Sequence, residues 1–142
     1  MPYNVAWLIQ NRVIYVRYFG EIHYKDYEET GSMFARMIDS GEAPVHVVVD
    51  ASTVTKAPRD IGKIVEYLRG YGRPGIGWVL TVTPNKLERF FAALVMHTFI
   101  SSLRSSMFGS VEEIPDFLAA RDGRMTSEQI AEALKENKSA SV

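Results

Sequence analysis

The segment from Val47 to Gly62, VVVDASTVTKAPRDIG, gathers side chains that could bind or transfer a charged group. An apolar, β-branched run ends in Asp50, and hydroxyl and cationic side chains follow it before Pro58. Open α/β sheets place ligands where strands end, and the first turn of the next helix favours an anion. The segment therefore predicts a loop that contacts a partner or an anion through Asp50, Ser52, Thr53, Thr55, Lys56, Arg59 and Asp60. In the alternative interpretation, Asp50, Ser52 and Thr53 only satisfy backbone groups of a connecting loop.

Other patterns that could indicate catalysis or a cofactor are incomplete. His23, His46 and His97 lack the spacing of metal ligands, and we expect packed or hydrogen-bonded imidazoles for His46 and His97. GYGRPG resembles a dinucleotide fingerprint as a string, but here a helix is predicted before it and a strand after it, the reverse of that site. A hydrolase or transferase using Asp50 and the loop hydroxyls lacks an identifiable pair of base and nucleophile. We expect no catalytic residue, no metal and no cofactor.

The composition restricts the class of protein further. The chain has 142 residues, no cysteine and a net charge of −1, which predicts one domain without disulfides and without affinity for nucleic acid. The longest apolar run, FFAALVM, is far shorter than the roughly 20 residues of a membrane span. The N-terminus lacks the pattern of a signal peptide, so we expect a cytoplasmic protein.

The elements that must position these side chains follow from hydrophobic periodicity. Strands are predicted at 5–9 and 13–19, with Val5, Trp7 and Ile9 on one face, and further strands at 45–49, 76–82 and around 107–108. Helices are predicted at 23–40, from Pro58 to Gly70, from Pro84 to about Leu103, and at 112–120. The order ββαβαβαβα predicts a single α/β domain, a mixed sheet flanked by helices.

A short C-terminal extension follows this domain. Thr126 and Gln129 have the spacing of a capping box for a short helix around Ile130 and Leu134, and the chain beyond Glu136 is expected to fray. We therefore expect a domain at 1–121 and a short helix with a frayed tail at 122–142.

The element order and the segment VVVDASTV resemble the STAS domain over about residues 5–121. This family includes sporulation-type anti-sigma-factor antagonists and STAS/SEC14-like proteins, and the resemblance implies a non-enzymatic regulatory domain with a protein partner. In the antagonists, a serine at the start of a helix accepts phosphate from a kinase. An ungapped alignment through Asp50 and Ser52 places Asp60 there, and a serine kinase cannot phosphorylate a carboxylate. The alignment requires Ser52 to follow the strand and Asp60 to lie in the first helical turn.

The helix expected to begin at Pro84 is apolar on two sides. One stripe is expected to pack on the sheet: Leu87, Phe90, Phe91, Leu94 and Thr98. The other is expected to form a homodimer or docking interface, unless the helix at 114–118 covers it: Ala92, Met96, Phe99, Ile100 and Leu103. The SEC14-like side of the resemblance implies an alternative, a small apolar or amphipathic ligand held beneath Phe90 and Phe91. An enclosed apolar cavity would favour the ligand, and an open apolar helix face would favour the protein partner.

Overall fold

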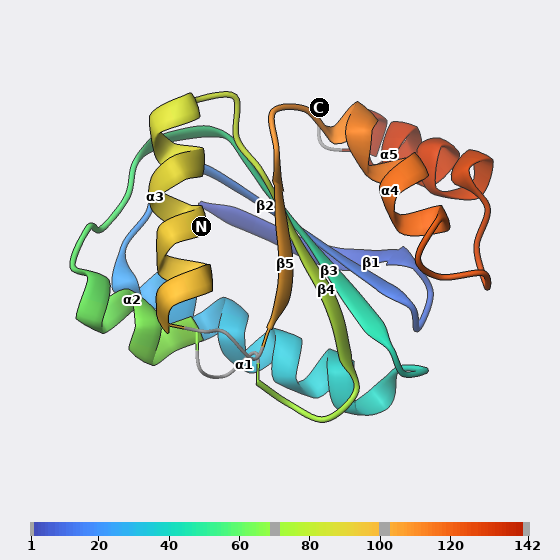
Figure 1. Ribbon diagram of the computed structural model, residues 1–142, viewed down its shortest axis with the longest axis horizontal. Coiled ribbons are helices and arrows are strands. Elements are labelled where there is room, and N and C mark those ends of the chain that lie inside the picture. The colour runs from blue at the N-terminus through green and yellow to red at the C-terminus, as the bar shows by residue number, and fades with distance from the viewer. Residues whose placement is uncertain (1, 69–71, 100–102, 141–142) are drawn as a thin grey trace.

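The computed structural model describes residues 2–68, 72–99 and 103–140 and shows a five-stranded sheet with helices on both sides (Figure 1). The strands are β1 (Tyr3–Ile9), β2 (Val13–Glu21), β3 (Val45–Lys56), β4 (Ile76–Val82) and β5 (Arg104–Phe108). The helices are α1 (Tyr24–Ser40), α2 (Ile61–Leu68), α3 (Lys86–Phe99), α4 (Ile114–Ala119) and α5 (Ser127–Ala140), with a 3-10 turn, η2 (Val111–Glu113), before α4. The predicted fold class, one α/β domain with a mixed sheet, is confirmed.

The sheet has the strand order β1-β2-β3-β4-β5, in which β1 is antiparallel to β2 and the other neighbours are parallel. Val45, Val47 and Val48 of the central strand are fully buried. Because side chains alternate along a strand, Val47 packs in the core on one face and Val48 in the core on the other. This is why the segment is apolar without interruption.

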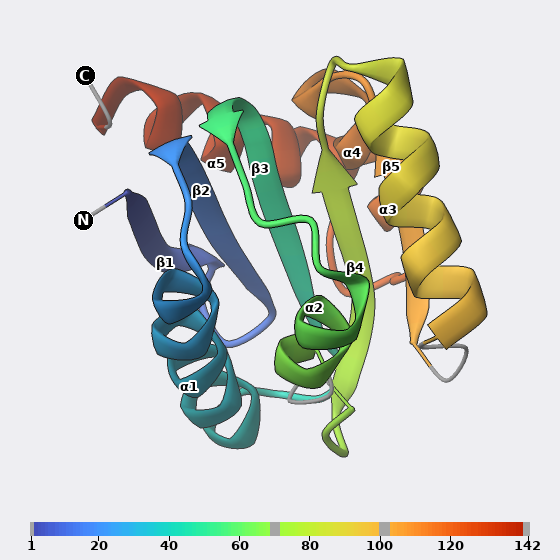
Figure 2. The same cartoon turned by 90° about the vertical axis from the view of Figure 1, so that its left-hand side faces the viewer.

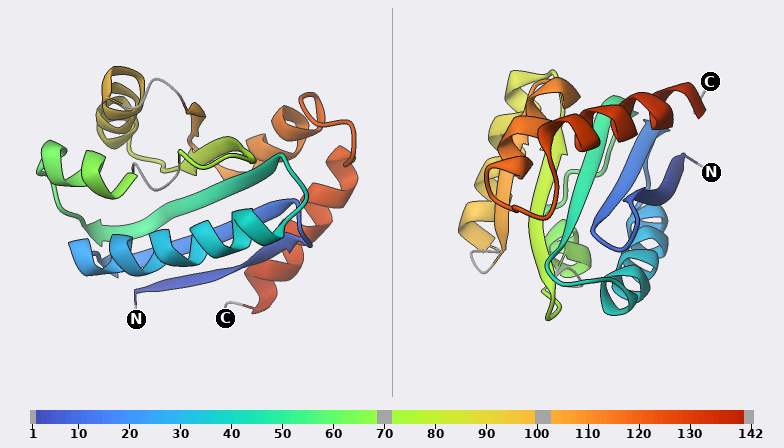
Figure 3. Two further views of the ribbon diagram at one scale, coloured as in Figure 1. Left: turned by 90° about the horizontal axis from the view of Figure 1, so that it is seen from below. Right: turned by 90° about the vertical axis from the view of Figure 1, so that its right-hand side faces the viewer.

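Helices cover the two faces of the sheet in two groups. Figure 2 shows α1 and α2 in front of the sheet with α4 and α5 behind it, and Figure 3 shows α4 and α5 lying across that second face. The core of the first face contains Phe34 and Ile38 of α1, and that of the second contains Ile114, Leu118 and Ile130. α3 contacts α2 and β5.

The opening hairpin is confirmed, but one of its side chains lies on the other face. Val5 and Trp7 pack against the core of the first face, whereas Ile9 packs against that of the second. The pairing of β1 with β2 shifts register between Trp7 and Ile9. Since one extra residue reverses the alternation of a strand, this irregularity turns Ile9 away from the face predicted for it.

The central strand continues beyond its predicted end. β3 runs to Lys56, because the second half of β2 continues to pair with it through Thr53, Val54 and Lys56. Ser52 therefore lies within a strand, and the ungapped alignment with the anti-sigma-factor antagonists fails together with its assignment of Asp60 to the phosphate-accepting position. Pro58 is not the first helical residue either, because α2 begins at Ile61.

α3 exposes two residues, Phe90 and Leu94, of the stripe that was expected to pack on the sheet. Phe90 and Leu94 are 68% and 47% exposed, whereas Ala92 lines a cavity that is open at one edge, and Leu103 packs against the core. Within this chain, Ala92 thus faces the cavity and Leu103 the core, and the interface expected on this stripe stays a prediction. The side chains of Met96 and Phe99 and the whole of Ile100 lie outside the described residues.

α4 does not cover α3. Its Phe117 contacts Trp78 and Phe108, which belong to the core of the second face. The cavity beside α3 instead shares Tyr18 and Val79 with the core of the first face. The two helices thus lie on opposite faces of the sheet.

The C-terminal helix is longer than predicted and is packed on the sheet. The predicted capping box is confirmed, since Gln129 N–H donates to Thr126 Oγ1 at 3.1 Å and Thr126 N–H donates to Gln129 Oε1 at 2.9 Å. Ile130 and Leu134 are buried, and the helix continues to Ala140 beyond the residue where fraying was expected. Among the helices of the described chain, none is long and apolar enough to cross a membrane.

Candidate functional site

A cavity of about 470 Å³ lies between α2, α3 and the first face of the sheet. This volume is within the range of about 300–1,000 Å³ that is typical of small-molecule sites. Its sheet side is formed by Val49 and Ala51 of β3, Val79 of β4 and Met107 of β5. The lining is therefore largely apolar, and it lies toward the carboxyl ends of parallel strands, where open α/β sheets place their ligands.

Thr81 in β4 and Thr83 directly after it add hydroxyl groups to this apolar surface. Thr81 and Thr83 line the cavity together with Val79, because residues two apart on a strand face the same side. Tyr67 of α2 and Tyr27 of α1 also line it. No partner in the described part of the chain pairs with the hydroxyls of these four residues. Burial raises the pKa of Tyr27 to about 12, so its hydroxyl stays protonated and can donate or accept a hydrogen bond.

Charged side chains from two elements meet at the edge of the cavity. Arg59, in the loop before α2, donates from Nη2 to Glu88 Oε1 in the first turn of α3, and both residues line the cavity. Lys56 at the end of β3 also lines it, and its Nζ lies 3.8 Å from Glu21 Oε1. The ion pair of Arg59 and Glu88 thus connects the loop before α2 to α3 at the edge of the cavity, and Lys56 is a second cation of the lining.

The structure divides the seven residues predicted from the segment at 47–62 into two groups. Ser52, Thr55, Lys56 and Arg59 line the cavity. Asp50, Thr53 and Asp60 do not.

The residues of the second group contact the scaffold instead, and Thr53 Oγ1 lies 3.5 Å from the carbonyl oxygen of Tyr18. Asp50 is buried, and its carboxylate accepts hydrogen bonds from Tyr15 Oη at 2.7 Å and from the backbone N–H of Ser52 at 3.0 Å. Since Tyr15 belongs to the core of the second face, Asp50 points away from the cavity. Asp60 caps α2, because its Oδ1 accepts from the backbone N–H of Lys63 at 3.3 Å.

Phe90 was expected above a ligand, but it does not line the cavity, and the side chain of Phe91 lies outside the described residues. α3 faces the cavity through Glu88 and Ala92, which are one helical turn apart. Sequence reasoning also missed Thr81 and Thr83. Their signal was the alternation of Val79, Thr81 and Thr83 in the run VLTVTP, immediately before a proline that ends the strand.

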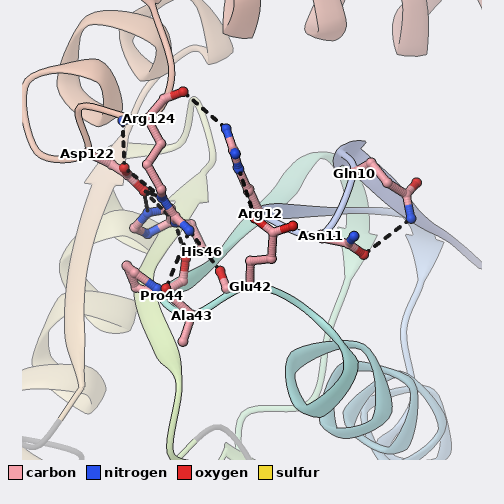
Figure 4. A network of polar contacts seen from close by, with 9 residues as sticks. All are labelled: Gln10, Asn11, Arg12, Glu42, Ala43, Pro44, His46, Asp122 and Arg124. Atoms are coloured by element: carbon pink, nitrogen blue, oxygen red, sulfur yellow. Dashed lines mark hydrogen bonds and ion pairs between the residues drawn. The ribbon is translucent and has the colours of Figure 1, made fainter.

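A second polar cluster lies at the opposite end of the strands and holds the C-terminal segment in place (Figure 4). His46 is 2% exposed, and its Nδ1 accepts from the backbone N–H of Trp78 at 2.9 Å. Its Nε2 therefore carries the proton and donates to Asp122 Oδ2 at 2.9 Å. Burial lowers the pKa of His46, and the guanidinium of Arg124 holds the pKa of Asp122 well below its usual range. The cluster is a neutral imidazole beside an ionised carboxylate.

Arg124 extends this cluster to the loop between α1 and β3. Its guanidinium donates to the carbonyl oxygens of Glu42 at 2.9 Å and Pro44 at 2.6 Å, in addition to Asp122. The prediction of a hydrogen-bonded imidazole is confirmed for His46, whereas His97 is exposed. Within the described residues, no group of three His, Asp or Glu side chains could hold a metal ion.

No family model matches the sequence, and no curated protein matches it. A solved structure of an uncharacterized protein of the DUF3478 family from Shewanella loihica PV-4, with a SpoIIAA-like fold, aligns with a TM-score of 0.60 at 10% identity, covering 82% of this chain and 91% of that one. The anti-sigma factor antagonist SpoIIAA in its unphosphorylated form aligns with a TM-score of 0.55 at 15% identity, covering 83% of this chain and 96% of that one. The chain therefore has the SpoIIAA-like fold that its resemblance to STAS domains predicted.

Proposed function

We propose that this chain is a non-enzymatic binding domain that holds a small amphipathic molecule between α2, α3 and the sheet. The observation that carries the proposal is the cavity of about 470 Å³, whose surface is apolar at Val49, Val79 and Met107 and polar at Thr81, at Thr83 and at its charged edge. Small-molecule sites combine an apolar lining with a few placed polar groups in this way. The polar groups here do not form a nucleophile activated by a base, so binding is the chemistry that they support.

A neutral apolar probe tests this proposal without regard to charge. N-phenyl-1-naphthylamine becomes fluorescent in apolar surroundings, and we expect it to bind the native protein with one site per chain. Ala92 lines the cavity, so Ala92→Phe fills part of it and should reduce probe binding at least tenfold. Bound probe should also raise the melting temperature of the native protein, because a ligand that binds the cavity stabilises the folded state, in which the cavity exists.

The matched control is Ala131→Phe, which places the same side chain on an exposed position of α5. It should leave the affinity for the probe unchanged. Equal binding by the native protein and Ala92→Phe, or absence of binding by the native protein, would contradict the proposal. Circular dichroism spectra and melting temperatures of both variants establish whether they are folded.

A second candidate function is regulation through a protein partner, favoured by the exposure of Phe90 and Leu94 one turn apart on α3. The fold is shared with an anti-sigma factor antagonist. Such regulation would not use a serine at the start of α2, since no serine or threonine stands between Ala57 and Leu68.

Light scattering of the native protein and of Phe90→Glu with Leu94→Glu tests whether the partner is a second copy of the chain. A native dimer that becomes a folded monomer in the double variant would support this candidate. A native monomer would rule out self-association through this surface.

A further inference from the structure

We propose that the ligand of the cavity is an amphiphile with one anionic group, and that Arg59 binds this group in place of Glu88. The inference rests on the proposed function and names the chemical class of its ligand. It concerns the charges at the edge of the cavity, whereas the proposed function depends on the apolar lining.

The ion pair between Arg59 and Glu88 is open to exchange. The side chains are 66% and 39% exposed, and exposed ion pairs contribute little to stability. Within the described residues, Glu88 is the one hydrogen-bond acceptor of the Arg59 guanidinium, which has five N–H donors. A carboxylate or similar anion entering the cavity can therefore take the place of Glu88 and form a bidentate pair with Arg59.

The polarity of the lining fits a ligand with one charged end. Along β4 and the residue that follows it, the cavity surface changes from Val79 through Thr81 to Thr83, toward the start of α3 where Glu88 lies. If Glu88 turns away from Arg59, the guanidinium of Arg59 has no anionic partner among the described residues, whereas Lys56, the other cation of the lining, still lies 3.8 Å from Glu21. A ligand with an apolar chain against Val79 and an acid group at Arg59 matches both the apolar and the cationic part of the lining. A neutral ligand leaves Arg59 paired with Glu88, so the guanidinium contributes nothing to its affinity.

The two members of the ion pair should affect binding in opposite directions. Isothermal titration calorimetry would compare octanoate, decanoate and dodecanoate with the 1-alcohols of the same lengths. We expect the native protein to bind each carboxylate more tightly than its alcohol. Arg59→Gln should weaken carboxylate binding about tenfold, because a charge-assisted hydrogen bond is lost. Glu88→Gln should strengthen it about threefold, because the competing carboxylate is removed. Alcohol affinity should not change in either variant.

Matched controls separate a local effect from a change in net charge. Arg36→Gln on α1 and Glu66→Gln on α2 alter exposed residues that do not line the cavity, and neither should change carboxylate affinity by more than about twofold. Melting temperatures establish that the variants are folded.

Three results would overturn the inference. Alcohols could bind the native protein as tightly as carboxylates, Arg59→Gln could bind carboxylates normally, or Glu88→Gln could weaken binding as Arg59→Gln does. Each leaves the proposed function in place if N-phenyl-1-naphthylamine still binds and Ala92→Phe still blocks it. Loss of both probe and carboxylate binding in the native protein would overturn the proposed function and the inference together.

Discussion

Nε2 of His46 in β3 lies 2.9 Å from Oδ2 of Asp122 in the segment between α4 and α5, although 76 residues separate them in the sequence. Both side chains are almost completely buried, at 2% and 6% exposed. The same imidazole accepts a hydrogen bond from the backbone of β4, so one ring ties the C-terminal segment to two central strands. The C-terminal helices are thereby held on the sheet by polar as well as apolar contacts.

Removal of the Asp122 carboxylate should destabilise the whole domain. Asp122→Ala leaves the buried Nε2–H of His46 without its acceptor. It also removes the carboxylate with which the guanidinium of Arg124 is paired. We expect a loss of about 3 kcal/mol in the free energy of unfolding, measured by urea denaturation. Asp39→Ala is the control, because its exposed ion pair with Arg73 should matter much less. Equal losses in the two variants would contradict the assigned role of Asp122.

Stability should decrease as the pH falls below the ordinary pKa of histidine, near 6.5. Burial lowers the pKa of folded His46, and a protonated ring could not accept from Trp78 N–H. The unfolded chain therefore binds a proton that the folded chain does not, and the free energy of unfolding falls from pH 6.5 down to the lowered pKa. Urea denaturation between about pH 7.5 and pH 5 measures this slope.

The variant His46→Gln should be less stable than the native protein, and its stability should depend less on pH in the same range. His97→Gln changes an exposed histidine and should retain the native slope. A native slope in His46→Gln would assign the pH dependence to other groups.

Gly77 is required by the imidazole of His46. A Cβ atom on Gly77 would lie 2.4 Å from His46 Nδ1 and 2.6 Å from Cε1, too close for any side chain. Gly77→Ala should cost about 2 kcal/mol or more, and the cost should fall by at least about 1 kcal/mol in a His46→Ala background, where the ring is absent. Strictly additive losses in this double-mutant cycle would show that the ring is not what restricts Gly77.

Gly31 in α1 provides the matched glycine control for that cycle. A Cβ on Gly31 would meet nothing within 4 Å, so Gly31→Ala should stabilise the protein by about 0.5–1 kcal/mol through helix propensity alone.

Asp60 should act as a helix cap whose identity can be exchanged. Asp60→Ala should destabilise the protein by about 1 kcal/mol, because the backbone N–H of Lys63 loses its acceptor. Asp60→Ser should stay within a few tenths of a kcal/mol of the native protein, since serine is an equally good cap. Thermal unfolding monitored by circular dichroism compares the three proteins. A large loss in Asp60→Ser would indicate that the carboxylate has a further partner.

The sequence alone determined the features that depend on near neighbours. The start of the central strand follows from the uninterrupted apolar run at 45–49. The capping box follows from the spacing of Thr126 and Gln129, and the order of strands and helices follows from hydrophobic periodicity. These interactions span a few residues, so the local pattern contains them completely. The same holds for the expectation that His46 would be hydrogen-bonded, because a buried imidazole in an apolar strand must satisfy its nitrogens.

Only the tertiary structure decided the features that depend on distant partners. β3 continues past Asp50 because β2 is long enough to pair with Thr53 and Lys56, and no local signal in β3 reports the length of its neighbour. α3 has two apolar stripes, and the position of the helix beside the sheet turned Ala92 inward and left Phe90 and Leu94 in solvent. The cavity likewise exists only where β3, β4, β5, α2 and α3 meet. Each element contributes only a few of the lining side chains, and no local pattern within one element predicts a binding site.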